Sequence, residues 1–160
     1  MEHLTQLAAR VGALLIQKGW TLATAESCTG GLISHQLTNV PGSSAYFIGG
    51  VVAYANRVKE ELLGVSKELL QTHGAVSAEV ALAMAQGIQR LLATDIGLAV
   101  TGIAGPSGGT PEKPVGTVFI AITTPKNREV RHLLSAADRE GNKRFSAEAA
   151  LRLLETMLTN

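Results

Sequence analysis

Two residues in one stretch of this chain, Ser44 and Lys59, could support nucleophilic chemistry. The stretch Pro41–Lys59 holds a Pro-Gly turn, two adjacent serines and an apolar segment. A serine becomes an effective nucleophile when a nearby base takes its proton. A lysine can be that base when burial favours its neutral amine. We hypothesise that Ser44 is the nucleophile and Lys59 its general base, although a turn serine and a solvated lysine fit the same pattern.

Two loops rich in glycine follow predicted strands and hold further candidates. Residues 27–31 lie between a strand at 20–26 and a helix at 30–38, and residues 101–109 follow a continuous apolar strand at 96–100. A strand, a small polar loop and a helix together can aim free backbone N–H groups at an anion, and an ordinary helix cap fits equally well. Ser27, between strand and helix, is the alternative nucleophile, since such a hydroxyl can be exposed and activated.

The remaining periodicity predicts a fold that brings these loops together. Apolar residues recur at helical spacing near both ends of the chain, and strands alternate with helices before a late hairpin. This order predicts an α/β protein with a three-layer α/β/α sandwich and a mixed, mostly parallel sheet. Ligands gather at the carboxyl ends of parallel strands, so both loops and the Ser44 turn are expected to line one pocket. The further predicted elements are helices at 2–18, 56–64, 66–72, 77–92 and from 139 onward, and strands at 47–54, 115–123 and 129–134.

Composition limits the classes of protein that fit. The 160 residues are 46% hydrophobic and 17% charged, which predicts one globular domain over residues 1–160. The net charge of +1, without a basic run, argues against a nucleic-acid-binding surface. The single cysteine, Cys28, excludes an intrachain disulfide and fits a reducing compartment. No signal sequence or membrane span is expected, and the scattered histidines suggest no metal site. We therefore expect a cytoplasmic protein without a cofactor. The sequence is compatible with a homo-oligomer.

Six ordered motifs, spread over nearly the whole chain, resemble the CinA C-terminal domain family. They are Ala25-Glu26-Ser27-Cys28-Thr29-Gly30-Gly31, Pro41-Gly42-Ser43-Ser44, Tyr54-Ala55-Asn56 with Lys59, His73-Gly74-Ala75-Val76-Ser77, Thr101-Gly102-Ile103-Ala104-Gly105-Pro106 and Lys113-Pro114-Val115-Gly116-Thr117-Val118. The characterised enzymes of this family are nicotinamide-nucleotide amidohydrolases. The resemblance implies a bacterial enzyme of pyridine-nucleotide recycling that hydrolyses the carboxamide of nicotinamide mononucleotide to nicotinate mononucleotide and ammonia.

The resemblance also implies roles for individual residues. It places the catalytic pair on Ser44 and Lys59, with an acyl-serine intermediate, and an assisting hydroxyl on Thr101. For the substrate phosphate we expect loop residues with Arg139 as the cation. The expected substrate-binding residues are Ser27, Thr29, Gly30, Tyr54, Gly102, Gly105 and Arg139.

The chain departs from the family pattern near its last helix. The usual Gly-Asp-Arg reads Ala137-Asp138-Arg139, and an arginine expected soon afterwards is Lys143, unless Arg144 takes its place. Lysine lacks the bidentate fork of arginine, so these departures bear on how the phosphate is held. Two alternatives stay open: an inactive nucleotide-binding or interaction module of the same family, and an amidase for another small carboxamide.

Overall fold

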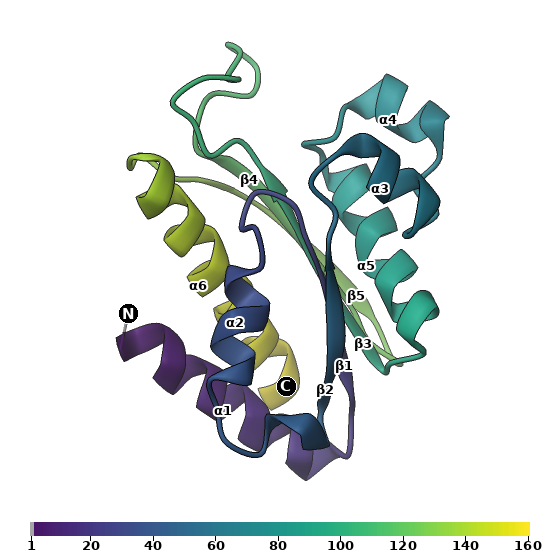
Figure 1. Ribbon diagram of the computed structural model, residues 1–160, viewed down its shortest axis with the longest axis vertical. Helices are drawn as coiled ribbons and strands as arrows, with labels where there is room; N and C mark the ends of the chain where they lie inside the picture. Colours follow the sequence, from purple (N-terminus) through teal and green to yellow (C-terminus); the bar gives the residue numbers. More distant parts are fainter. Residues whose placement is uncertain (1) are drawn as a thin grey trace.

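A five-stranded mixed sheet divides the protein into three layers in the computed structural model, which describes residues 2–160 (Figure 1). The strand order is β2-β1-β3-β4-β5; β1 pairs in parallel with β2 and β3, while β4 runs antiparallel to β3 and β5. The predicted fold class and late hairpin are therefore confirmed. The strands are β1 (Leu22–Glu26), β2 (Phe47–Val52), β3 (Ile96–Gly102), β4 (Thr117–Thr123) and β5 (Arg128–Leu134).

The helices cover the two faces of the sheet in separate groups (Figure 1). One face carries α1 (Glu2–Lys18), α2 (Leu32–Thr38) and α6 (Arg139–Thr159), and the other carries α3 (Asn56–Glu61), α4 (Lys67–His73) and α5 (Ala78–Leu92). A short 3-10 helix, η1 (Ser43–Ala45), precedes β2. No helix of the described chain combines the length and apolar character that a membrane crossing requires.

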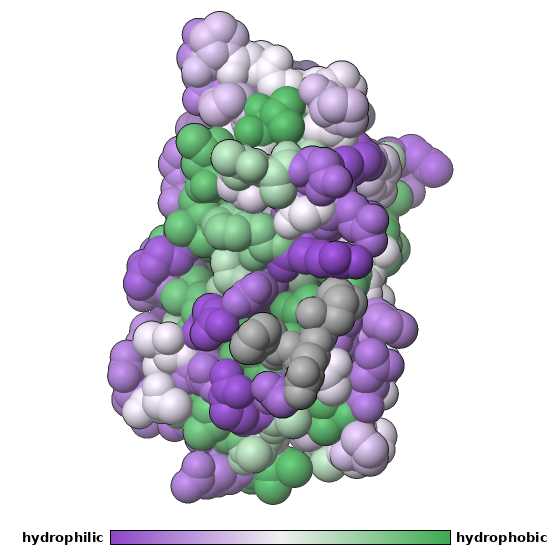
Figure 2. Space-filling view, turned by 90° about the vertical axis from the view of Figure 1, so that its left-hand side faces the viewer, coloured by the Kyte–Doolittle hydropathy of each residue, from purple (hydrophilic) through white to green (hydrophobic). Residues whose placement is uncertain are grey.

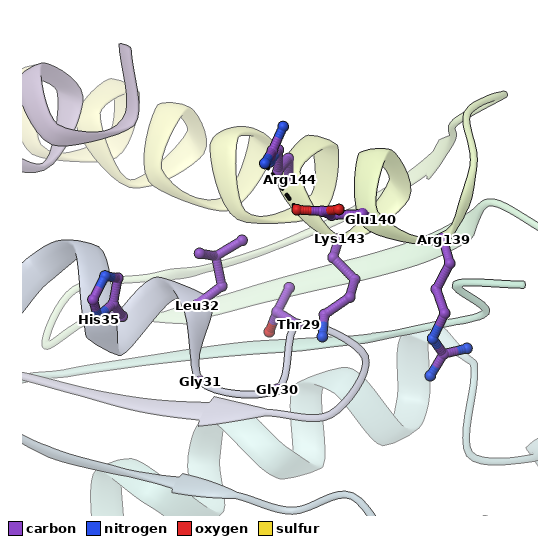
Figure 3. Close-up of a pocket in the computed structure, with 9 residues that line it drawn as sticks. All are labelled: Thr29, Gly30, Gly31, Leu32, His35, Arg139, Glu140, Lys143 and Arg144. Carbon is purple, nitrogen blue, oxygen red and sulfur yellow. Dashed lines mark hydrogen bonds and ion pairs between the residues drawn. The ribbon is translucent and has the colours of Figure 1, made fainter. Parts of the chain in front are cut away.

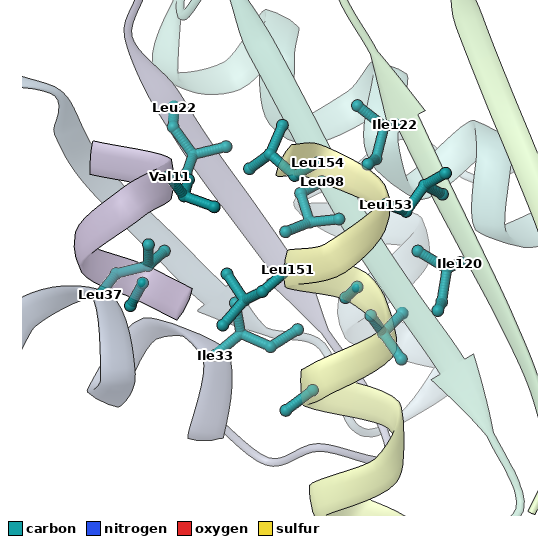
Figure 4. Close-up of a cluster of buried hydrophobic side chains, with 14 of the residues drawn as sticks. Val11, Leu22, Ile33, Leu37, Leu98, Ile120, Ile122, Leu151, Leu153 and Leu154 are labelled. Carbon is teal, nitrogen blue, oxygen red and sulfur yellow. The ribbon is translucent and has the colours of Figure 1, made fainter. Parts of the chain in front are cut away.

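Side chains of different size separate the two cores. Toward α1 and α6 the strands present large aliphatic residues such as Leu98, Ile120 and Ile122, which pack with Leu151 and Leu154 (Figure 4). Toward α5 the alternate positions are small: Ala23, Ala25, Ala99 and Ala121. Successive side chains of a strand point to opposite faces, so this alternation lets α5 approach closely; a Cβ on Gly97 would lie only 2.1 Å from the carbonyl oxygen of Ala85.

The outward face of the α1–α6 layer is solvated. Figure 2 shows hydrophilic and hydrophobic side chains interspersed on this face. Ion pairs along it include Arg10–Glu155 at 2.6 Å, Arg144–Glu140 at 2.9 Å and Arg152–Glu148 at 2.8 Å. Such exposed pairs contribute little to stability, so the two apolar cores hold the layers together.

Strand direction decides which loops meet. Because β1, β2 and β3 are parallel, the segments that follow Glu26, Val52 and Gly102 emerge at the same edge of the sheet. β3 is two residues longer than predicted, because Thr101 and Gly102 pair with Phe119 and Val118 of β4. Thr101 is therefore held in a strand rather than in a loop.

Candidate functional site

The buried amine of Lys59 lies at the centre of this sheet edge. Lys59 belongs to the short helix α3, which follows β2 after residues 53–55, and its side chain is only 1% exposed. Its Nζ lies 3.1 Å from Ser27 Oγ, 2.7 Å from the carbonyl oxygen of Ala53 and 3.1 Å from that of Tyr54. A protonated amine has three N–H donors, and these three oxygens accept all of them.

The surroundings of Lys59 favour its neutral form. Burial lowers the pKa of Lys59 below its ordinary value, opposed by a smaller electrostatic effect of Cys28 that raises it. A neutral amine keeps two N–H groups and one lone pair. With the carbonyl oxygens of Ala53 and Tyr54 accepting the two N–H groups, the lone pair is left to face the hydroxyl of Ser27. This is the arrangement in which a lysine can take a proton from a serine.

The turn after β1 holds Ser27 against Lys59. Ser27 is 8% exposed, and its backbone N–H donates to the carbonyl of Val100 at 3.0 Å. The chain then reverses: the N–H of Gly30 donates to the carbonyl of Ser27 at 3.2 Å. Gly30 has a φ of +62°, which a residue with a Cβ rarely adopts. The sequence around Ser27 therefore builds a tight turn with a nearly buried hydroxyl.

A pocket of about 330 Å³, the Ser27 pocket, opens beside this pair. As predicted, both glycine-rich loops contribute to it. Thr101 lies at its wall and donates its hydroxyl proton to the carbonyl of Ala75 at 2.8 Å, so its oxygen can only accept from a ligand. The lining residues are Ser27, Cys28, Tyr54, Asn56, Lys59, Ala75, Val76, Thr101, Gly102, Ile103, Ala104, Gly105, Ser107, Gly108 and Arg139.

A second pocket of about 610 Å³, the Lys143 pocket, lies between residues 29–31 and the start of α6 (Figure 3). Arg144 pairs with Glu140 at 2.9 Å, whereas Lys143 has no hydrogen-bond or ion-pair partner in the described part of the chain. A Cβ on Gly30 would lie 3.3 Å from Lys143 Nζ, so this amine approaches the turn. The lining residues are Thr29, Gly30, Gly31, Leu32, His35, Arg139, Glu140, Lys143 and Arg144.

Arg139 lines both pockets and joins three segments at their boundary. Its guanidinium donates to the carbonyl of Gly105 at 2.6 Å and to the hydroxyl of Tyr54 at 3.2 Å. These contacts bring together the start of α6, the loop after β3 and the segment after β2. The two adjoining pockets can therefore hold the two ends of one small molecule, with Arg139 between them.

The structure corrects the predicted pairing of Ser44 with Lys59. Ser44 lies in η1, before Phe47 begins β2, and Phe47 stands beside Leu22 at the amino end of β1. Lys59 contacts Ser27, which follows the carboxyl end of β1. The length of the five-residue strand, roughly 16 Å at 3.3 Å per residue, separates the two sites. Within this chain Ser44 cannot reach Lys59, and it does not share a pocket with the glycine-rich loops.

A second correction concerns the start of α2, where we expected free N–H groups to face an anion. The carboxylate of Glu26 already accepts from the N–H groups of Ile33 and Ser34, both at 2.9 Å. Thr29, an expected ligand residue, donates its hydroxyl proton to the same carboxylate at 2.7 Å. Thr29 and Gly30 still line the Lys143 pocket, but the unpaired cation there is Lys143.

The contact of Glu26 with the start of α2 was not predicted, although the sequence contains a signal for it. An acidic residue that ends a largely apolar strand just before a helix start has backbone donors within reach. No group of three or more potential metal-ligating His, Cys, Asp or Glu side chains exists among the residues described.

Comparison with known proteins gives a consistent set of relatives. A family model described as the CinA C-terminal domain matches residues 4–158. CinA-like proteins of Desulfosudis oleivorans and Syntrophobacter fumaroxidans are 52% and 51% identical over 95% and 94% of this chain. The chain spans only 37% and 35% of the length of these curated relatives.

Solved structures resemble the chain over almost its whole length. The competence/damage inducible protein CihA of Agrobacterium tumefaciens is 39% identical with a TM-score of 0.94, covering 99% of this chain and 96% of its own. The competence damage-inducible protein A of Klebsiella pneumoniae is 36% identical with a TM-score of 0.95, covering 98% of both chains.

Proposed function

The chain belongs to the CinA C-terminal domain family, and from this membership and the contact between Ser27 and Lys59 we propose that it hydrolyses the carboxamide of nicotinamide mononucleotide. The products are nicotinate mononucleotide and ammonia, and the reaction serves bacterial pyridine-nucleotide recycling in the cytoplasm. The observation that carries the proposal is the 3.1 Å contact between Lys59 Nζ and Ser27 Oγ. It pairs a nucleophile with a buried base whose pKa is lowered.

The proposed reaction proceeds through an acyl-enzyme. Ser27 Oγ attacks the carboxamide carbon while its proton passes to the lone pair of Lys59. The protonated Lys59 then gives this proton to the departing nitrogen, the C–N bond breaks and ammonia leaves. Water, deprotonated by Lys59, attacks the acyl-serine ester, and the proton returns to Ser27 Oγ as the acid is released. One lysine serves as base and acid in both halves, so the reaction needs no metal or cofactor.

The two pockets support a nucleotide as the substrate. The carboxamide occupies the Ser27 pocket, where Thr101 offers an acceptor oxygen to the amide N–H. The phosphate occupies the Lys143 pocket, where Lys143 has no hydrogen-bond or ion-pair partner in the described chain. Arg139, Tyr54 and Gly105 stand at the boundary, where the ribose passes.

An ammonia-release assay tests this proposal. Purified protein is offered nicotinamide mononucleotide, nicotinamide riboside, nicotinamide and unrelated small carboxamides, with Ser27→Ala as the matched control. We expect release from the mononucleotide and none above background with Ser27→Ala. Release from another carboxamide alone would assign a different amidase specificity. Nucleotide binding without any release would favour an inactive binding module.

A further inference from the structure

Glu26 is a buried charged residue that the proposed reaction does not use. Its side chain lies at the carboxyl end of β1 and is 1% exposed. One carboxylate oxygen accepts from the hydroxyl of Thr29 at 2.7 Å and from the N–H of Ile33 at 2.9 Å. The other accepts from the N–H of Ser34 at 2.9 Å and from its hydroxyl at 2.6 Å. Four donors compensate the burial of this charge.

These bonds cap α2 from outside the helix. The residue before the helix is Gly31, which has no side chain with which to cap. The N–H groups at the second and third helical positions lack partners within any helix, and here both donate to Glu26. An internal carboxylate therefore occupies the place at the helix start that an anionic ligand could otherwise take.

The main chain of Glu26 also contacts the segment that holds the base. Its carbonyl accepts from the N–H of Ala53 at 2.7 Å, and the carbonyl of Ala53 in turn accepts from Lys59 Nζ at 2.7 Å. Through its carboxylate Glu26 holds the turn after Ser27, and through its carbonyl it holds the segment that contacts Lys59. Contacts of Glu26 therefore help to position both Ser27 and the segment that holds Lys59.

We propose that Glu26 is a positioning residue for the Ser27–Lys59 pair, whose carboxylate holds the turn of Ser27 in register with Lys59. The inference rests on the proposed function for its substrate, but the positioning of Ser27 can be measured without that substrate. Gln is the informative replacement, since it keeps the size of Glu while its NH₂ group faces donors where the carboxylate accepts.

The first test measures the reactivity of Ser27 toward a fluorophosphonate. In this reaction Ser27 Oγ bonds to phosphorus, fluoride leaves and Lys59 takes the proton. Mass spectrometry locates the label and gives its rate in wild type and Glu26→Gln. We expect labelling of Ser27 in wild type and a rate at least about tenfold lower in Glu26→Gln, because misplacement of a reacting group lowers its reactivity steeply.

Ser34→Ala is the matched control, because it removes one of the four bonds to the same carboxylate but lies within α2. Melting temperatures are measured for all three proteins. If Glu26 positions Ser27, the labelling rate should fall far more in Glu26→Gln than in Ser34→Ala, although the melting temperatures of the two variants fall by similar amounts. If the labelling rates of the two variants follow their melting temperatures alike, Glu26 only stabilises the fold and the proposal is overturned.

The second test separates this proposal from the proposed function. On nicotinamide mononucleotide, Glu26→Gln should lower kcat and leave KM unchanged, since the Lys143 pocket keeps its residues. If wild type labels at Ser27 but releases no ammonia, the proposed substrate is wrong, while the labelling comparison still decides the role of Glu26. If wild type does not label at Ser27, no reactive pair exists and the positioning role fails with it.

Discussion

Two serine-bearing turns of this chain are alike in sequence and differ in what surrounds them. Ser27 and Ser44 both stand in short segments with small residues and glycine beside a strand of the same parallel pair. Ser27 follows its strand, is nearly buried and meets the amine of Lys59. Ser44 precedes its strand and is exposed. The comparison teaches that position relative to strand direction, rather than local composition, assigns a serine to the site.

The largest effect that this comparison predicts is on turnover. Ser27→Ala should lower kcat on the order of 10³-fold or more, since it removes the proposed nucleophile. Ser44→Ala should stay within about twofold, because an exposed substitution rarely has a larger effect. Ammonia release by both variants, with melting temperatures as the control, checks the pair. Loss of activity in Ser44→Ala alone would reverse the assignment.

Replacing Lys59, the proposed base, should have the next largest effect. Lys59→Met should lower kcat by roughly 10²–10⁴, the usual contribution of general acid–base catalysis. Lys59→Arg should be as inactive, because an arginine does not release its proton at accessible pH. The exposed lysine of the β4–β5 turn, in Lys126→Met, provides the control. Substantial kcat in Lys59→Arg would mean that charge, and not proton transfer, is the role of Lys59.

The Lys143 pocket predicts a selective loss of affinity. Lys143→Ala should raise KM for nicotinamide mononucleotide roughly tenfold with little change in kcat, as expected when uniform binding is lost. The same substitution should leave KM for nicotinamide riboside unchanged, because the riboside has no phosphate. Arg139→Ala should raise KM for both compounds, because Arg139 also holds Tyr54 and Gly105. Arg152→Ala, farther along α6, is the control; equal losses on both substrates in Lys143→Ala would contradict a phosphate site.

Burial of Lys59 predicts a dependence of stability on pH that the Ser44 turn cannot produce. The folded pKa of Lys59 is lowered, so between that value and the ordinary 10.5 the unfolded chain binds more protons. The free energy of unfolding therefore rises with pH in this window, by at most about 1.4 kcal/mol per pH unit for one group. Denaturant titrations at several pH values should show this rise of unfolding free energy with pH in wild type and a smaller rise in Lys59→Met. In the kinetics, the acid limb of the pH profile of kcat/KM should lie below pH 10.5. Equal slopes would show that Lys59 is not a perturbed group.

The smallest predicted effects distinguish the two turns by their glycines. Gly42 has a φ of +84° with open space for 4 Å around the place that a Cβ would take, and Gly30 has a φ of +62° with Lys143 Nζ 3.3 Å from that place. Alanine at either site should cost roughly 1 kcal/mol of stability through backbone strain. Only Gly30→Ala should also raise KM for the nucleotide. Thermal melts with steady-state kinetics provide the measurement, and a raised KM in Gly42→Ala would argue against the distinction.

Local pattern was sufficient for most of the fold. Helical spacing in residues 2–18 and 77–92 and the continuous apolar run at 96–100 predict elements that the structure contains. The sequence pattern did not predict the end of a strand where that end depends on pairing with another strand. β3 extends through Thr101 and Gly102 because β4 pairs with both residues. The late hairpin was predictable because its two strands are joined by a short turn. The position of β1 between β2 and β3 depends on pairing between strands that are distant in sequence, so only the complete sheet reveals it.

The sequence by itself determined the α/β class, the two glycine-rich loops and the residues capable of chemistry, because these follow from side-chain type and short-range periodicity. Only the tertiary structure decided which serine faces Lys59, since the parallel direction of β2 carries Ser44 to one edge of the sheet and Lys59 to the other. It likewise decided that Glu26 caps α2, because four donors converge on that carboxylate only after the chain has reversed at Gly30 and Gly31.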